Sequence, residues 1–138
     1  MPTDNRPPQT LLGFDFGEKR TGIAVGQSLT ASATALSTLH SRQNKPDWSG
    51  IEALIKEWQP DALVVGIPVH MDGTEQAMTT AARKFVRQLE GRFHLPVYEA
   101  EERLSSMEAE QLLGKVADKE AIDSEAARII LQSWLNDQ

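Results

Sequence analysis

The sequence predicts an α/β domain in which a mixed five-stranded sheet carries helices on both faces. Two apolar segments, residues 11–16 and 22–26, are joined by a short charged turn, as is typical of a β-hairpin. A continuous apolar run at residues 62–67 is typical of a central strand covered on both sides. Beyond the hairpin, strand-like and helix-like segments alternate, which predicts parallel strands joined by helical crossovers.

The first half of the chain follows this plan element by element. A third strand is expected at residues 31–36, and a polar loop with a proline at residues 40–47. Ser49 and Glu52 form a capping box that predicts a helix ending at Pro60. After the strand at residues 62–67, Asp72 and Glu75 are candidate caps for a second helix with one apolar face.

The second half predicts one more strand, at residues 96–100, followed by helices. Ser105 and Glu108 form a second capping box, which predicts a short helix through residue 113. Residues 114–120 are charged and loop-like, and a last helix is expected from about Asp123 to Leu135. Three antiparallel strands are therefore followed by two strands parallel to the first.

Length and composition indicate a single domain at residues 11–138, preceded by a flexible tail at residues 1–10. The chain has no cysteine and no apolar run of the roughly 20 residues that a membrane span requires, so we expect a cytoplasmic protein. Its net charge of −6 argues against a protein that grips nucleic acid over its whole surface. A nuclease stays compatible with this charge, because a carboxylate metal site is itself acidic.

Acidic residues fall at the expected carboxyl edge of the sheet, where ligands of open α/β sheets bind. Asp15 lies late in the first strand, Glu101 and Glu102 follow the fifth, and Asp123 begins the last helix. Converging carboxylates of this kind can hold one or two Mg²⁺ or Mn²⁺ ions for phosphodiester hydrolysis. Asp123 could instead be a helix N-cap, and the two glutamates ordinary surface acids. A strand-embedded aspartate has no such structural explanation.

Basic residues beside these acids are candidates for binding substrate phosphates. Lys19 and Arg20 lie in the predicted hairpin turn, and Arg103 follows the acidic pair. Each could equally be a solvated turn charge. A second group of cations is interpreted as a solvated helix face: Arg83, Lys84, Arg87 and Arg92.

Four sequence blocks resemble the YqgF/RuvX family of Holliday-junction resolvases. The first is GFDFGEKRTGIAV at residues 13–25, and the second is VVGIPVHMDGTE at residues 64–75. The third, EERLSSMEA, and the fourth, IDSEAARIIL, cover residues 101–109 and 122–131. Together the blocks run in the family's order over nearly the whole chain.

The resemblance implies a ribonuclease H-like fold and a metal-dependent nuclease. Its substrate would be either Holliday junctions or the precursor of the small-subunit (16S) ribosomal RNA, matured at its 5′ end. By the matching motifs, Asp15, Glu102 and Asp123 would be the catalytic acids. The third block usually begins Asp-Glu-Arg, and here Glu101 stands in place of the aspartate. Neighbouring residues of an extended chain point to opposite sides, so which glutamate faces the metal stays open.

Two other functions are compatible with the sequence. An Asp-x-Gly hairpin also wraps nucleotide phosphates in ATP-binding relatives of actin and the sugar kinases, but those proteins need two such lobes. The chain could instead be a non-catalytic RNA-binding factor of ribosome assembly, which would bind without turnover. Resolution of a symmetric junction would require a homodimer with two sites, and the sequence leaves the oligomeric state open.

Overall fold

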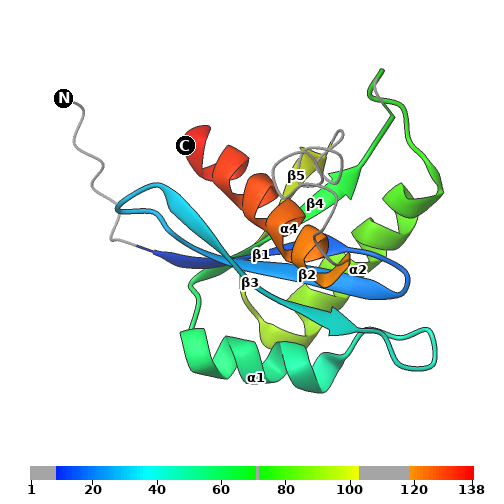
Figure 1. Cartoon of the computed structure of the whole chain (residues 1–138), viewed down its shortest axis with the longest axis horizontal. Helices are drawn as coiled ribbons and strands as arrows, with labels where there is room; N and C mark the ends of the chain where they lie inside the picture. Colours follow the sequence, from blue (N-terminus) through cyan, green and yellow to red (C-terminus); the bar gives the residue numbers. More distant parts are fainter. Residues whose placement is uncertain (1–8, 71, 103–118) are drawn as a thin grey trace.

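The computed structural model describes residues 9–70, 72–102 and 119–138, which form a five-stranded sheet with helices on both faces (Figure 1). The strands are β1 (Thr10–Phe16), β2 (Arg20–Gln27), β3 (Ser32–His40), β4 (Ala62–Pro68) and β5 (Val97–Glu102). The helices are α1 (Trp48–Trp58), α2 (Ala77–Phe93) and α4 (Lys119–Asn136). Arg103, the Ser105–Glu108 capping box with its helix, and residues 1–8 of the expected tail lie outside the described residues.

The strands lie in the order β3-β2-β1-β4-β5. The pairs β1–β2 and β2–β3 are antiparallel, whereas β4 is parallel to both β1 and β5. The predicted mixed sheet is confirmed. Because β1, β4 and β5 run the same way, Phe16, Pro68 and Glu102 end at one edge of the sheet.

Alternate residues of the central strands face two separate cores. Leu12 and Phe14 of β1 pack with α1 and α2, and Phe85 of α2 lies edge-on to Phe14, with ring centroids 5.7 Å apart. Leu11 faces the opposite side and packs under α4, with Leu131 as a fully buried neighbour. Figure 1 shows α4 lying across one face of the sheet and α1 and α2 on the other. In the described part of the chain, no helix is both long enough and apolar enough to cross a membrane.

The α4 helix packs directly on strand backbone. A Cβ atom added at Gly22 of β2 would lie 1.9 Å from the carbonyl oxygen of Asp123, and one at Gly13 of β1 would lie 2.8 Å from the Cβ atom of Leu131. Real Cβ atoms do not approach other atoms so closely. Glycine at these positions therefore sets how near the helix can lie to the sheet.

Two strands extend beyond their predicted ends. β3 runs to His40 rather than residue 36, because its ladder with β2 continues to the pair Arg20–His40. β5 runs to Glu102, because Glu101 and Glu102 pair with Ile67 and Pro68 of β4. The two glutamates thus belong to a strand instead of following it.

The helix starts also differ from the predicted ones. Asp47 caps α1 by accepting a hydrogen bond of 3.0 Å from the Gly50 N–H, so the capping box of Ser49 and Glu52 was wrong. Gln76, rather than Asp72 or Glu75, caps α2. Asp72 instead accepts a 2.9 Å hydrogen bond from the Thr74 N–H in the preceding turn, and Glu75 pairs with Arg83. Short polar side chains near a helix start compete for the same role, and tertiary contacts decide among them.

The last helix begins at Lys119, four residues before the predicted start. Asp123 therefore lies inside the helix and does not cap it. This excludes capping as the reason for an aspartate at this position.

Replacing Gly22 with alanine should destabilise the fold by about 2–4 kcal/mol, because the new methyl group would overlap the backbone of α4. Gly91 offers a matched control in α2, since a Cβ atom there would meet nothing within 4 Å. Gly91→Ala should raise stability by about 0.5–1 kcal/mol. Urea denaturation of both variants tests this, and equal stability of Gly22→Ala and wild type would contradict the described helix position.

Candidate metal-dependent active site

A cavity of about 380 Å³ opens at the edge where β1, β4 and β5 end. Its lining comes from both ends of the chain: Asp15, Phe16, Gly17, Glu18, Arg20, Pro68, Gln76, Met78, Glu102 and Asp123. The cavity lies in the size range of small-ligand and active sites. The edge position agrees with the site expected from the sequence.

Asp15 reaches the cavity because of the alternation along β1. Leu11 and Gly13 face α4, so Asp15, two residues further on, faces α4 as well. Its partner in the ladder is Gly22, above which lies the backbone of Asp123. The glycine thus lets an aspartate of the last helix come beside an aspartate of the first strand.

Glu102, rather than Glu101, faces this cavity. Ala100 of β5 packs in the core beneath α4, and Glu102 lies on the same side of the strand. Its Oε2 atom is 3.2 Å from the position that a Cβ atom on Gly66 would take. Glu101 points to the opposite side and is exposed. The geometry separates the two glutamates that the sequence alone could not.

Asp15 and Glu102 form a carboxyl–carboxylate pair. Burial raises the pKa of Asp15 well above its ordinary value, and the charge and hydrogen bond of Glu102 and the charge of Asp123 raise that pKa further. Burial also raises the pKa of Glu102, although its hydrogen bond with Asp15 acts in the opposite direction. Two buried carboxyl groups in contact favour sharing one proton through this hydrogen bond.

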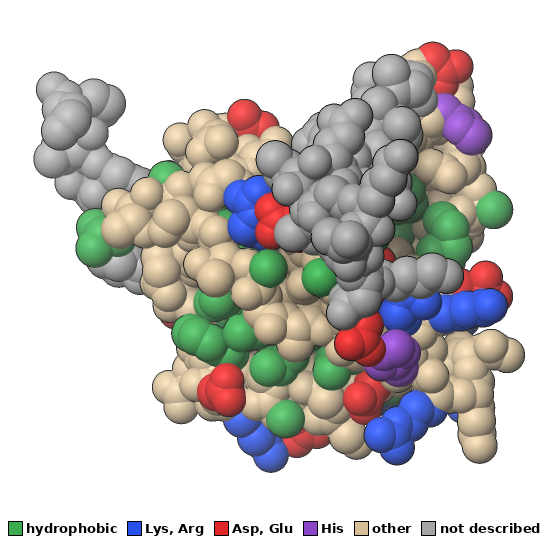
Figure 2. All heavy atoms as spheres, in the orientation of Figure 1, with side chains coloured by type: hydrophobic (Ala, Val, Ile, Leu, Met, Phe, Trp, Pro, Cys, Tyr) green, Lys and Arg blue, Asp and Glu red, His purple; other side chains and the backbone are tan. Residues whose placement is uncertain are grey.

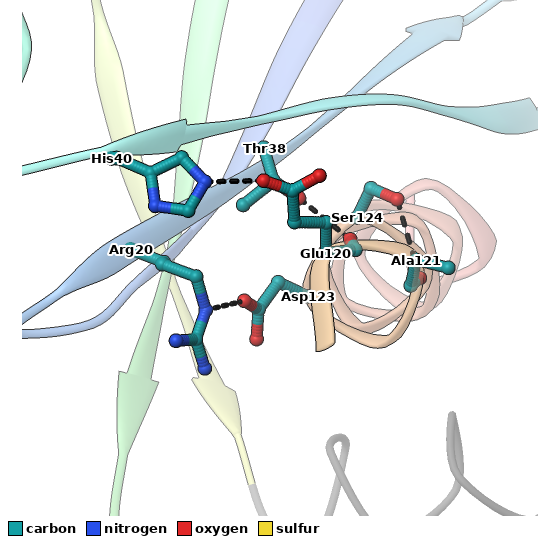
Figure 3. A network of polar contacts seen from close by, with 7 residues as sticks. All are labelled: Arg20, Thr38, His40, Glu120, Ala121, Asp123 and Ser124. Atoms are coloured by element: carbon teal, nitrogen blue, oxygen red, sulfur yellow. Dashed lines mark hydrogen bonds and ion pairs between the residues drawn. The ribbon is translucent and has the colours of Figure 1, made fainter. Parts of the chain in front are cut away.

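Arg20 neutralises the third acid of the site. Its Nε atom donates to the Oδ2 atom of Asp123 over 2.6 Å, and both side chains are about three-quarters buried (Figure 3). Arg20 is the first residue of β2 and not part of the turn as predicted. The structure thus brings Arg20 to the acids, whereas Lys19 is exposed in the turn beside it.

A second set of contacts holds the start of α4 against β3. The Thr38 hydroxyl donates to the Glu120 carbonyl oxygen over 2.6 Å, and the Glu120 carboxylate pairs with His40 (Figure 3). Within the helix, the Ser124 hydroxyl donates to the Ala121 carbonyl oxygen over 3.2 Å. Sequence reasoning missed these positioning residues, because the partners lie about 80 positions apart and no local pattern marks them.

The donor set suits a hard divalent cation. Asp15, Glu102 and Asp123 offer carboxylate oxygens, which Mg²⁺ and Mn²⁺ prefer, and a bound cation would relieve the repulsion that raises the pKa of Asp15. Among the described residues, no three acidic or histidine side chains are already spaced to hold an ion. The side chains of Asp15 and Glu102 are hydrogen-bonded to each other, and the Asp123 carboxylate accepts a hydrogen bond from Arg20. Binding would have to replace these contacts.

The sheet and its covering helices give this chain a ribonuclease H-like fold. RuvC from T. thermophilus, solved with a Holliday junction substrate, superposes with a TM-score of 0.57 at 17% identity over 93% of this chain and 94% of RuvC. The Fowlpox virus resolvase superposes with a TM-score of 0.54 at 11% identity, over 93% and 97% of the two chains. At such identities, the likeness concerns the fold.

Sequence comparison identifies the family. Residues 9–137 match the family model described as "RuvX: Holliday junction resolvase", so the chain belongs to the RuvX family, as predicted. A protein of Saccharophagus degradans named "Putative pre-16S rRNA nuclease" is 49% identical over 91% of this chain and 92% of its own. A Serratia proteamaculans protein of the same name is 47% identical over 94% and 96%.

The variant Asp15→Asn should be more stable than wild type in metal-free buffer at neutral pH. Folding raises the pKa of the Asp15 carboxyl, so this group stabilises the fold at pH values below its pKa in the unfolded chain. That contribution is lost as the pH rises through the pKa in the folded protein. The gain of the variant should therefore grow from pH 4 to pH 8. At neutral pH we expect about 1–3 kcal/mol, and each kcal/mol raises Tm by about 3–5 °C.

Thermal unfolding across this pH range, in EDTA, measures the difference. Glu57→Gln, an exposed change on α1, removes the same charge far from the site and should follow the wild-type profile. An Asp15→Asn variant that is less stable than wild type at pH 8 would contradict the repulsion between Asp15 and the neighbouring carboxylates.

Proposed function

We propose that this chain is a metal-dependent endonuclease that hydrolyses phosphodiester bonds in structured nucleic acid, with the 5′ end of the 16S rRNA precursor as its substrate. The observation that carries the proposal is the meeting of Asp15, Glu102 and Asp123 around one cavity at the edge of a resolvase-like sheet. Acids from β1, β5 and α4 meet there, and the charges of Glu102 and Asp123 both raise the pKa of Asp15. A site that must hold cations explains them.

In this proposal, Asp15, Glu102 and Asp123 would hold Mg²⁺ or Mn²⁺, which would activate the attacking water and stabilise the charge on the leaving oxygen. Arg20 exchanges its partner, leaving Asp123 for a substrate phosphate that it can bind through two N–H groups. Lys19 adds a positive charge at the rim. Glu101 stays outside the metal site, because it lies on the other side of β5.

The choice of RNA as the substrate rests on the names of the relatives. The alternative substrate, a Holliday junction, rests on the family model and the fold. Proteins 47–49% identical to this chain are named for a nuclease of pre-16S rRNA. A Holliday junction is the second candidate substrate, since the family model carries that description. Cutting a symmetric junction would require a homodimer that presents two sites. A cytoplasmic location fits either substrate.

Cleavage should require each of the three acids of the cavity and a divalent cation. Asp15→Asn, Glu102→Gln and Asp123→Asn should each lower the cleavage rate at least about 100-fold in Mg²⁺ or Mn²⁺. Glu101→Gln is the matched control, because it changes the neighbouring glutamate on the opposite side of the strand and should cleave like wild type. The assay offers a precursor-rRNA fragment, a four-way DNA junction and plain duplexes to purified protein.

The outcomes separate the candidates. Cleavage of the junction and not of the RNA would replace the proposed substrate. Binding without turnover under either metal would favour a non-catalytic assembly factor. Loss of cleavage in Glu101→Gln with full activity in Glu102→Gln would overturn the assignment of the metal site.

A further inference from the structure

Two turns lie side by side at the end of the sheet that carries the cavity. One joins β1 to β2 and contains Lys19, and the other follows β3 at residues 41–47 (Figure 1). The Ser41 N–H donates to the Lys19 carbonyl oxygen over 2.9 Å, so the β2–β3 ladder continues into both turns. The second turn is thereby held at a fixed place beside the first.

The second turn has a defined backbone shape. Arg42 and Lys45 exchange two backbone hydrogen bonds, of 2.8 and 2.9 Å, across the two residues between them. Those residues, Gln43 and Asn44, have φ angles of 53° and 62°, as a tight two-residue hairpin requires. Directly opposed residues of such a pair project their side chains to the same side. The turn therefore presents Arg42 and Lys45 together.

These cations are exposed and carry no ion pair. Lys19, Arg42 and Lys45 are exposed, and within the described part of the chain none of their side chains has an ion-pair partner. The opposing charges nearby are Glu18, which is exposed in the first turn, and Asp47, whose carboxylate caps α1. Glu120 on α4 is paired with His40. On a chain of net charge −6, three exposed cations thus lie on adjoining turns at this end of the sheet.

We propose that Lys19, Arg42 and Lys45, here called the turn platform, bind the phosphodiester backbone of the substrate next to the bond that is cut. Lys19 precedes Arg20, which lines the cavity, so the platform continues outward from the proposed reaction site. Arg42 lies two residues beyond His40, the ladder partner of Arg20, so it is about 7 Å further out along the strand. Figure 2 shows Lys and Arg side chains at the lower right, where both turns lie in Figure 1.

The partner of the platform is identified by its chemistry. Arginine and lysine without carboxylate partners suit phosphate oxygens, and no aromatic side chain lies in either turn to stack on bases. The platform should therefore bind by charge and shape, with no sequence preference. The inference rests on the proposed function for the nature of this partner, since a nuclease needs such a surface beside its site.

The test is the double variant Arg42→Gln/Lys45→Gln, with Lys84→Gln/Arg87→Gln as the matched control. The control removes one lysine and one arginine, both exposed, from the middle of α2. Both pairs are made in the Asp15→Asn background, so that binding is measured without cleavage. Fluorescence anisotropy gives Kd for the precursor-rRNA fragment and for the four-way DNA junction at 50, 100 and 200 mM KCl.

The platform variant should raise Kd about 5- to 20-fold at 100 mM KCl, and its slope of log K against log salt should be shallower by about 1–2. The control should leave both quantities unchanged. The nucleic acid that shows the larger increase in Kd, RNA or junction DNA, is identified as the one that binds the platform. An equal loss in both double variants, or no loss in either, would overturn the inference. Unimpaired binding by a wild-type protein that cleaves neither substrate would instead refute the proposed function and leave the platform standing.

Discussion

The site depends on the close approach of α4 to the backbone of the sheet. The helix lies over β1 and β2 where Gly13 and Gly22 leave no side chain between them, and the carbonyl oxygen of Asp123 occupies the space that a methyl group at Gly22 would need. This contact joins the end of the chain to its beginning. Without it, the acids of β1 and β5 would face a distant helix, and no third carboxylate would reach the cavity.

The same approach places negative charges where water is partly excluded. Two contacts relieve that cost in the described structure, since Asp15 shares a proton with Glu102 and Arg20 pairs with Asp123. Both contacts involve groups that a divalent cation or a phosphate would engage. Under the proposed function, these internal partners would be replaced by the cation and the substrate. Active sites commonly lower the stability of the folded protein in this way.

Two neighbouring groups of opposite charge lie at the end of the sheet that carries the cavity. The cavity gathers carboxylates, while the adjoining turns gather exposed cations along a continued β2–β3 ladder. For an acidic protein, this division resolves the apparent conflict between net charge and a polyanionic partner. The cations lie on turns of defined backbone shape next to the acids, as the proposed function requires of a surface that would bind a phosphate backbone beside a metal site. On α2, Arg83 pairs with Glu75 and Arg92 stacks over Trp48, whereas Lys84 and Arg87 are exposed.

Local pattern was sufficient for the strand directions, the mixed sheet and the acids at its edge, whereas the order of the strands across the sheet came from the structure. Apolar runs and hairpin lengths restrict strand direction to one choice, and Asp15 is conspicuous because an apolar strand rarely contains a carboxylate. Helix starts were less predictable. Asp47 and Ser49 are both acceptable caps for α1, and nothing in the intervening residues distinguishes them.

By itself, the sequence determined the family and the fold and indicated acids at the edge of the sheet, since these depend on motifs and periodicities that act over short stretches. Only the tertiary structure decided that Glu102 and not Glu101 enters the cavity, that Asp123 lies within a helix, and that Arg20 is its partner. The physical reason is that these facts depend on where a strand ends and on contacts across about 100 positions. Such contacts exist only once the helix has packed on the sheet.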